Sequence, residues 1–265
     1  MQPYINLFHY KISIYGLLIL IGIFFGSLIA IHLGKRRNQK SEDILFASAY
    51  ACIGLIIGGK LLYILVNLST LIKYADILLA SPSKIVAVLS GGFVFYGGFI
   101  GVILGIFIYC KQYKLSYIDV LETIVPVIPF IHAFGRIGCF YVGCCYGKPY
   151  SGPFHIVYHY SDSAPNNIAL FPVQILESGL NILSFFIILL FTLKIRKRFV
   201  TIGMYLVTYS IIRFILEFYR GDLERGFLFS ISTSQWISIF CLPIGLYFMY
   251  KSHFQMNYKE QTTPH

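Results

Sequence analysis

One histidine, one arginine and three cysteines stand close together in an apolar part of the chain. They occur in the order His132, Arg136, Cys139, Cys144 and Cys145. An arginine at the centre of a membrane helix costs about 2.5–3.5 kcal/mol on insertion scales, so it usually has an anionic partner. A guanidinium binds a phosphate or a carboxylate through two parallel hydrogen bonds. The segment therefore predicts a site for an anion, and a lipid phosphate is the anion that a bilayer supplies.

A second apolar segment carries polar side chains four residues apart. Tyr209, Arg213 and Glu217 share one helical face, and Arg220 follows about one turn later. Arg213 and Glu217 can form an ion pair that only joins helices, or they can line a cavity for a lipid headgroup. Two arginines from different helices clamp a phosphate better than either does alone, so we expect Arg213 to meet Arg136.

The cysteines and the histidine allow further chemistry. Three thiols near His132 could ligate zinc or a cluster, but their spacing differs from standard zinc modules, and no metal is expected. A disulfide is the alternative, from Cys139 to Cys144 or Cys145, because adjacent cysteines seldom bond to each other. Histidine has an unperturbed pKa of about 6.5, which suits a general base, so His132 is either a base or a packed or capping residue.

The composition indicates the kind of elements that must position these residues. The chain has 265 residues, of which 57% are hydrophobic and 12% are charged. A soluble domain is about 25% charged, so lipid must cover much of this apolar surface. We predict an all-α polytopic membrane protein. The net charge of +10 is attributed to cytoplasmic connections, and no nucleic acid is expected as a partner.

Seven apolar stretches are long enough to cross the hydrocarbon core, which takes about 20 residues. They lie approximately at Ile12–His32, Ile44–Leu68, Val86–Cys110, Val120–Tyr141, Gln174–Leu193, Ile202–Phe218 and Ile231–Tyr250. Lysine and arginine are in excess after the first, third, fifth and seventh stretches, which predicts an N-terminus outside and a C-terminus in the cytoplasm. We therefore predict one transmembrane domain over residues 1–265, with an extracytoplasmic loop at 147–171 and a polar cytoplasmic tail at 251–265. The loop is either a lid or an ordinary connection, and the end of the tail is expected to be disordered.

The third stretch is rich in glycine. Three glycines stand four residues apart and share one helical face: Gly97, Gly101 and Gly105. This pattern lets transmembrane helices pack closely. Two glycine pairs also flank Tyr96: Gly91, Gly92, Gly97 and Gly98. Such pairs can free the backbone to turn or to present N–H groups to an anion. Tyr96 then points into a cavity, or it serves in packing.

These motifs resemble those of the prolipoprotein diacylglyceryl transferase family of bacterial inner membranes. Gly135-Arg-Ile-Gly-Cys-Phe-Tyr-Val-Gly-Cys-Cys-Tyr-Gly147 keeps the frame of that family's Gly-Arg-x-Gly-Asn-Phe-x-Asn-Gly-Glu-x-x-Gly. Gly91-Gly-Phe-Val-Phe-Tyr-Gly-Gly-Phe-Ile-Gly101 resembles its Gly-Gly-x-x-Phe-His-Gly-Gly-x-x-Gly. Shorter matches keep the family's order along the chain: Tyr15-Gly16-Leu17, Gly58-Gly59-Lys60, Pro172-Val-Gln174 with Glu177, and Tyr209-Ser-Ile-Ile-Arg213 with Glu217 and Arg220. The resemblance runs over roughly residues 12–245.

The resemblance implies a reaction and a set of residues. Such enzymes move the diacylglyceryl group of phosphatidylglycerol onto the lipobox cysteine thiol of a prolipoprotein signal peptide, without a cofactor or metal. A thioether forms and glycerol phosphate leaves. Arg136 and Arg213 would hold the phosphate, and Tyr96, His132 and Tyr209 complete the expected catalytic set. The expected substrate-binding residues are Tyr15, Lys60, Gly91, Gly92, Gly97, Gly98, Gly138, Gln174, Glu177, Glu217 and Arg220. The implied location is the bacterial inner membrane, among membrane lipids.

The chain departs from the family pattern at several positions. Tyr96 stands where the family has a catalytic histidine, and a tyrosine is a poor general base but a usable hydrogen-bond donor. A free thiol has a pKa near 8.5, so its deprotonation needs help, and His132 could give it. Cysteine or valine replaces the family's Asn, Asn and Glu at Cys139, Val142 and Cys144. Two alternatives stay open: a paralogue that acts on another lipid or acceptor, and a transporter that uses the arginines as an anion site.

Overall fold

The computed structural model describes residues 4–7, 10–76, 81, 83–84, 92–195, 197–222 and 226–262. The chain forms two compact units, and each is described by itself. The first comprises Met1–Arg37 and Glu122–His265, and the second comprises Asn38–Leu121. The prediction of one transmembrane domain over the whole chain stays a prediction.

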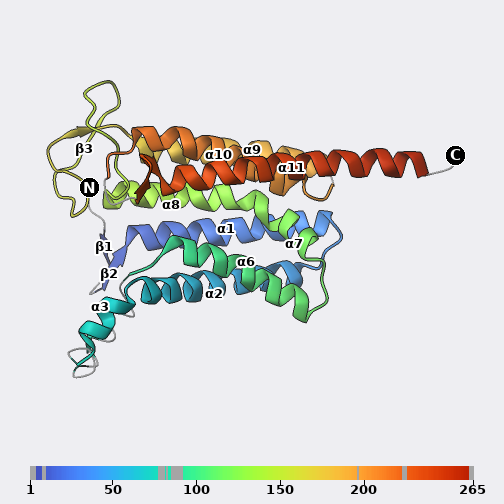
Figure 1. The fold of residues 1–265 in the computed structure, drawn as a ribbon, viewed down its shortest axis with the longest axis horizontal. Helices are drawn as coiled ribbons and strands as arrows, with labels where there is room; N and C mark the ends of the chain where they lie inside the picture. The colour runs from blue at the N-terminus through green and yellow to red at the C-terminus, as the bar shows by residue number, and fades with distance from the viewer. Residues whose placement is uncertain are drawn as a thin grey trace. The chain divides into compact units, whose positions relative to one another are not determined.

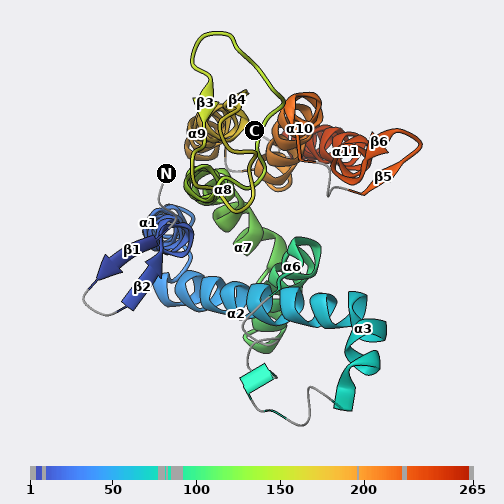
Figure 2. The same ribbon diagram turned by 90° about the vertical axis from the view of Figure 1, so that its left-hand side faces the viewer.

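Long helices make up most of the first unit (Figures 1 and 2). They are α1 (Ile14–Arg36), α8 (Ile128–Val142), α9 (Val173–Lys194), α10 (Val200–Leu216) and α11 (Thr233–Thr262). Each helix packs against the next in this order, α1 on α8, α8 on α9, α9 on α10 and α10 on α11. Short 3-10 turns adjoin two of them, η1 (Val125–Val127) before α8 and η2 (Glu217–Tyr219) after α10.

Three short antiparallel strand pairs lie outside the long helices in the described part of this unit. They are β1 (Tyr4–Leu7) with β2 (Tyr10–Ser13), β3 (Ile156–Val157) with β4 (Ala169–Leu170), and β5 (Phe227–Leu228) with β6 (Ile231–Ser232). The second pair lies in the predicted loop 147–171, which has a small core of its own around Tyr158, Ala164 and Leu170. The Tyr158 hydroxyl donates to the carbonyl of Phe140 at 3.0 Å, so this loop is attached to the end of α8.

The second unit contains α2 (Ser41–Val66), α3 (Leu68–Lys73), α6 (Phe95–Gln112) and the start of α7 (Tyr117–Ile124). Helices α2 and α6 pack on each other along glycines. A Cβ atom added to Gly101 would overlap the carbonyl oxygen of Gly54, and one added to Gly97 would overlap that of Gly58. The expected close packing of the glycine face is therefore confirmed.

Six helical segments in the described part of the chain are long and apolar enough to cross a membrane. They are Ile14–Arg36, Ser41–Val66, Phe95–Gln112, Tyr117–Val142, Val173–Lys194 and Val200–Tyr219. They match the first six predicted stretches, although the third helix begins only at Phe95, and residues 85–91 lie outside the described residues. The chain is therefore a mostly helical, multi-pass membrane protein.

The seventh predicted stretch corresponds to α11, which is not among those six segments. Polar residues stand at both ends of this helix, at Thr233–Gln235 and after Tyr250, and they make it less apolar than the other long helices. The helix also continues through the predicted tail as far as Thr262, where the sequence suggested disorder. A run without glycine or proline after Gly245 allows this continuation, since those residues are the ones that most disfavour a helix.

Candidate active site

Glu177 lies where three helices of the first unit meet. On α9 it shares a buried face with Gln174 and Asn181, because residues three and four apart lie on one side of a helix. Its Oε1 atom lies 3.0 Å from Nη2 of Arg136 on α8, and its Oε2 atom lies 3.8 Å from Nη1 of Arg213 on α10. Only 2% of Glu177 is exposed. The structure thus brings the two arginines onto one buried carboxylate.

A second carboxylate continues this arrangement at the end of α10. Glu217 Oε2 lies 2.9 Å from Nη2 of Arg213, one turn earlier, and 3.9 Å from Nη1 of Arg220. The Nε atom of Arg220 donates to Oδ1 of Asp222 at 3.0 Å. Arg213 also donates from Nη2 to the hydroxyl of Ser234 at 2.9 Å. The spacing along α10 and η2 therefore produces a row of alternating charges.

This cluster holds equal numbers of cationic and anionic side chains. The cations are Arg136, Arg213 and Arg220, and the anions are Glu177, Glu217 and Asp222. Buried ions need such partners, since the desolvation cost of a lone ion amounts to several kcal/mol. Among the described residues, Nη1 of Arg213 is buried without a hydrogen-bond acceptor, because Glu177 is 3.8 Å away. This nitrogen can therefore donate to an anion that enters the cluster.

His132 lies beside the cluster on α8. Its Nε2 atom accepts a hydrogen bond from Nε of Arg136 at 3.2 Å, and it lies 3.8 Å from Oε1 of Glu177. Its ring packs near that of Tyr209, with 6.0 Å between centroids. A ring nitrogen that accepts a hydrogen bond carries no proton, so its lone pair is already used. His132 therefore orients Arg136 here, and its predicted role as a base stays a prediction that requires Arg136 to move.

Gln174 and Tyr15 lie against the C-terminal end of α8 and the turn that follows it. The Nε2 atom of Gln174 donates to the carbonyl of Cys144 at 3.0 Å and to the hydroxyl of Tyr158 at 3.4 Å. A Cβ atom on Gly138 would lie 2.7 Å from the ring of Tyr15, so the missing side chain lets that ring lie against α8. The structure therefore places these residues in the first unit with Arg136, as packing and positioning groups around the end of α8.

Other predicted residues belong to the second unit. Lys60 on α2 donates from Nζ to the carbonyl of Gly92 at 2.8 Å. Gly97 and Gly98 face α2 and Phe93, so close packing accounts for both glycines. Tyr96 is 37% exposed on α6, while Gly91 lies outside the described residues. The substrate-binding and catalytic roles of this group stay predictions.

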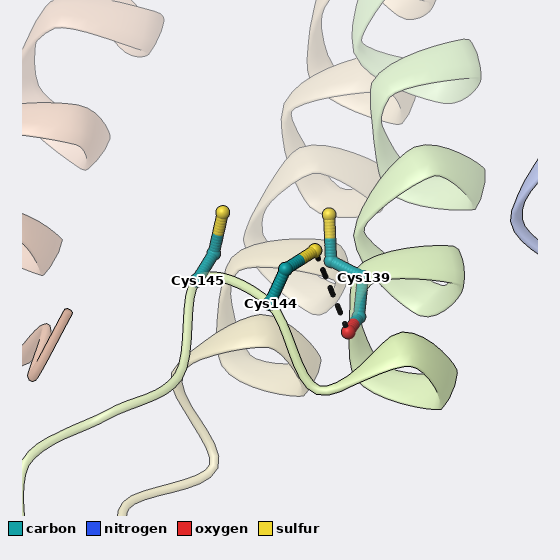
Figure 3. Close-up of side chains that lie close together, drawn as sticks. All are labelled: Cys139, Cys144 and Cys145. Carbon is teal, nitrogen blue, oxygen red and sulfur yellow. Dashed lines mark hydrogen bonds between the residues drawn. The ribbon is translucent and has the colours of Figure 1, made fainter. Parts of the chain in front are cut away.

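Three cysteine side chains converge at the C-terminal end of α8 (Figure 3). The sulfur atoms of Cys139, Cys144 and Cys145 all lie within 4.8 Å of one another. All six cysteines are free thiols in the structure, which contains neither of the two disulfides that the sequence left open for Cys139. Hydrogen bonds from the other two thiols lower the pKa of Cys145, and the charges of Arg136 and Arg220 lower it further, although burial raises it. Hydrogen bonds with Cys139 and Cys145, together with burial, raise the pKa of Cys144.

Sequence reasoning missed several partners in this site. Asp222 follows Arg220 by two residues, and this proximity was the only signal of their pairing. Ser234 and Tyr158 gave no signal, because serine and tyrosine are common and their contacts join segments far apart in the sequence. A helical-face argument identifies residues that lie on one helix, but it does not identify the partners that other segments supply.

Six membrane-spanning candidates and a buried arginine–carboxylate cluster define a multi-pass membrane protein with paired charges in its interior. A profile described as "Prolipoprotein diacylglyceryl transferase" matches residues 3–251. The chain belongs to the prolipoprotein diacylglyceryl transferase family.

Two relatives illustrate the similarity. A phosphatidylglycerol–prolipoprotein diacylglyceryl transferase of Clostridium tetani is 37% identical over 248 residues, which cover 93% of this chain and 96% of the relative. A second transferase, numbered 2, from Clostridium perfringens is 34% identical over 241 residues, which cover 91% of each chain. The similarity therefore extends over the arginine–carboxylate cluster and nearly all of both proteins.

Proposed function

We propose that this protein transfers the diacylglyceryl group of phosphatidylglycerol to the lipobox cysteine thiol of a prolipoprotein. The observation that carries this proposal is the meeting of Arg136 and Arg213 at Glu177, with Nη1 of Arg213 still available to an anion. The relatives named as transferases of this type support the same reaction.

The arginines act on the phosphate of the lipid headgroup. The contact between Arg213 and Glu177 is the long one, at 3.8 Å, so a phosphate oxygen competes for Nη1 without breaking a hydrogen bond. The acceptor thiolate attacks the glycerol carbon that is bonded to the phosphate oxygen, and that carbon–oxygen bond breaks. Negative charge then grows on the departing glycerol phosphate, where preorganised donors stabilise the transition state. Glu177 and Glu217 hold the two guanidinium groups in place.

An apolar groove beside Arg213 suits a lipid chain. It lies between α10 and α11, has a volume of about 320 Å³ and is lined by Ser210, Ile211, Phe214, Ile215, Ser238, Ile239 and Leu242. These α10 residues stand within one turn of Arg213, so a headgroup at the arginine brings the acyl chains near the groove. An acyl chain in this groove keeps its apolar surface away from water.

We also propose a seven-helix topology in the bacterial inner membrane. The N-terminus lies outside and the C-terminus lies in the cytoplasm. The excess of lysine and arginine after the odd-numbered predicted stretches supports this orientation. Helix α11 covers the seventh predicted stretch as one continuous helix, which supports a count of seven membrane helices. Labelling of single cysteines placed in the 147–171 loop and after α1 tests it, because an impermeant reagent should reach only the loop in intact cells.

The function is tested by expressing the chain in cells depleted of their own transferase. Growth and prolipoprotein lipidation should recover with the native chain and fail with Arg213→Ala at equal membrane levels. Purified protein, labelled phosphatidylglycerol and a lipobox peptide provide the direct assay. Lipid turnover without peptide modification would indicate a paralogue with another acceptor, and uptake of an anion into vesicles without lipid turnover would indicate a transporter. Either outcome would refute the proposed reaction.

A further inference from the structure

Three thiols at the end of α8 form a group that the arginine mechanism does not use. Cys139, Cys144 and Cys145 have their sulfur atoms within 4.8 Å of one another. Among the described residues, no other three side chains of the types that ligate metals come as close together. Figure 3 shows Cys139 on α8 and Cys144 and Cys145 on the turn that follows, with their side chains on one side of that turn. Gly143, in the left-handed region at a φ of 84°, makes this turn possible.

The spacing of the sulfur atoms suits a thiophilic metal ion better than a disulfide. A zinc–sulfur bond is about 2.3 Å long, so the sulfurs of a tetrahedral site stand about 3.8 Å apart. The three sulfur atoms lie within 4.8 Å of one another, so no pair needs to close by more than about 1 Å to reach this separation. A disulfide would join two of them and leave the third sulfur unused beside it. Three converging sulfurs are instead a ligand set for zinc.

The cluster stands beside the elements that hold the arginine–carboxylate cluster. Cys139 follows Arg136 by three residues on α8, which is about 4.5 Å along the helix axis. On α9, Gln174 donates to the carbonyl of Cys144 at 3.0 Å and precedes Glu177 by one turn. Cys139 is buried, while Cys144 and Cys145 are half-buried, so two of the three ligand residues are partly exposed.

We propose that Cys139, Cys144 and Cys145 bind one zinc ion whose fourth position takes the thiol of the acceptor cysteine. This inference rests on the proposed function, and it departs from the expectation, drawn from the sequence, that no metal is needed. Catalytic zinc sites keep such an open fourth position. A thiol that coordinates zinc loses its proton outright. The ion thereby deprotonates the acceptor thiol. Tyr96 is poorly suited to this task, and His132 can perform it only after Arg136 gives up its hydrogen bond to the Nε2 atom of His132.

The reaction is an alkylation of sulfur. The acceptor thiol binds zinc and releases its proton to solvent. The zinc-bound thiolate then uses an electron pair to form a bond with the glycerol carbon of phosphatidylglycerol. The bond from that carbon to the phosphate oxygen breaks, and its electron pair leaves with glycerol phosphate. The product thioether is a neutral, weaker ligand than the thiolate, so it dissociates and zinc is unchanged. Arg136 and Cys139 are three residues apart on α8, so the zinc site and the phosphate site stand on neighbouring positions of one helix.

Metal binding is tested first, on the full chain purified in detergent. We expect about one zinc ion per chain by elemental analysis, and a cobalt-substituted chain with sulfur-to-cobalt charge-transfer absorption. Cys139→Ser and Cys145→Ser should lose both signals, whereas Cys52→Ser and Cys241→Ser, at cysteines outside the cluster, should keep them. A lipobox peptide with its cysteine should change the cobalt spectrum, and the same peptide with serine should not. A native chain without zinc, or a cobalt spectrum that ignores the cysteine peptide, overturns the proposal.

Transfer assays separate this inference from the proposed function. Removal of the metal with a chelator should slow transfer by about 10²–10⁴-fold, the usual contribution of proton transfer in a catalytic step, and zinc should restore it. Full transfer by metal-free protein would keep the function and refute the zinc site. A metal-loaded chain that binds the peptide thiol yet transfers nothing would refute the function and keep the site. A disulfide between Cys139 and either neighbour, trapped by thiol blocking in intact membranes, would also refute the zinc site.

Discussion

Removal of the Glu177 charge is the most direct perturbation of the candidate site. Glu177 accepts one close contact, at 3.0 Å from Arg136, and two longer ones, at 3.8 Å from Arg213 and His132. Arg213 keeps Glu217 at 2.9 Å when Glu177 is changed. The substitution therefore leaves one buried guanidinium, that of Arg136, without an anionic partner.

The expected magnitudes differ between two variants. Glu177→Ala breaks a buried ion pair by removing one partner, which costs about 3–5 kcal/mol. Glu177→Gln keeps an amide oxygen that still accepts from Arg136, so the loss is the difference between a charged and a neutral hydrogen bond, about 1–2 kcal/mol. Both variants misplace Arg136, and we expect transfer to fall by about 10²–10³-fold, as for the loss of one oxyanion donor.

The matched control is Glu122→Gln. Glu122 is also fully buried, and it accepts hydrogen bonds from the backbone N–H groups of Thr201 and Ile202 at 3.2 and 3.1 Å. Thr201 is about 18 Å from Arg213 along α10, at 1.5 Å per residue. This variant should lose stability and keep its transfer rate per folded molecule.

Two measurements decide between these expectations. Unfolding of the purified proteins in detergent by a denaturant titration gives the free energy of unfolding, and labelled phosphatidylglycerol with a lipobox peptide gives the transfer rate. Equal stability of Glu177→Ala and the native chain would show that Arg136 does not depend on this carboxylate. Native transfer by Glu177→Gln would refute the positioning role of Glu177.

Three further predictions concern the arginine clamp, the glycine face and the loop. Arg213→Lys keeps the charge but loses the planar pair of donors, so transfer should fall at least about tenfold while the protein level in the membrane stays unchanged; a native rate would refute the clamp. Gly101→Ala should destabilise the protein by about 1–3 kcal/mol or more, since its Cβ atom overlaps the carbonyl of Gly54, whereas Gly179→Ala, with open space, should not; thermal unfolding compares them. Tyr158→Phe removes the hydrogen bond to the Phe140 carbonyl and should cost about 1–2 kcal/mol, seen as faster proteolysis within residues 147–171, and an unchanged pattern would contradict the anchoring role.

The glycine-rich stretch illustrates how one pattern serves two interpretations. Gly97 was expected both in helix packing and in substrate binding, and its contact with Gly58 confirms the packing. Small residues four apart bring two backbones together whatever else they do, so the sequence predicted this part reliably. The interpretation of Tyr96 depends on what its side chain faces, and the spacing of glycines along one helix does not determine that.

The spacing of Cys139, Cys144 and Cys145 along the sequence did not determine whether their side chains meet. Their order in the sequence allowed a disulfide or a metal site. The left-handed turn at Gly143 reverses the chain after α8 and brings Cys144 and Cys145 back toward Cys139. The left-handed conformations of Gly143 and Cys145 shape the turn in which the three thiols meet, and φ angles of this kind do not follow from the spacing of the cysteines.

The sequence by itself determined the membrane class, six of the helical stretches and the shared face of Arg213 and Glu217. These properties follow from apolar length and from the helical period, both of which are local. Only the tertiary structure decided that Arg136 and Arg213 meet at Glu177, that His132 uses its Nε2 atom to hold Arg136, and that Ser234 binds Arg213. These contacts join separate helices, and their formation depends on how the helices pack, which no single segment of the sequence specifies.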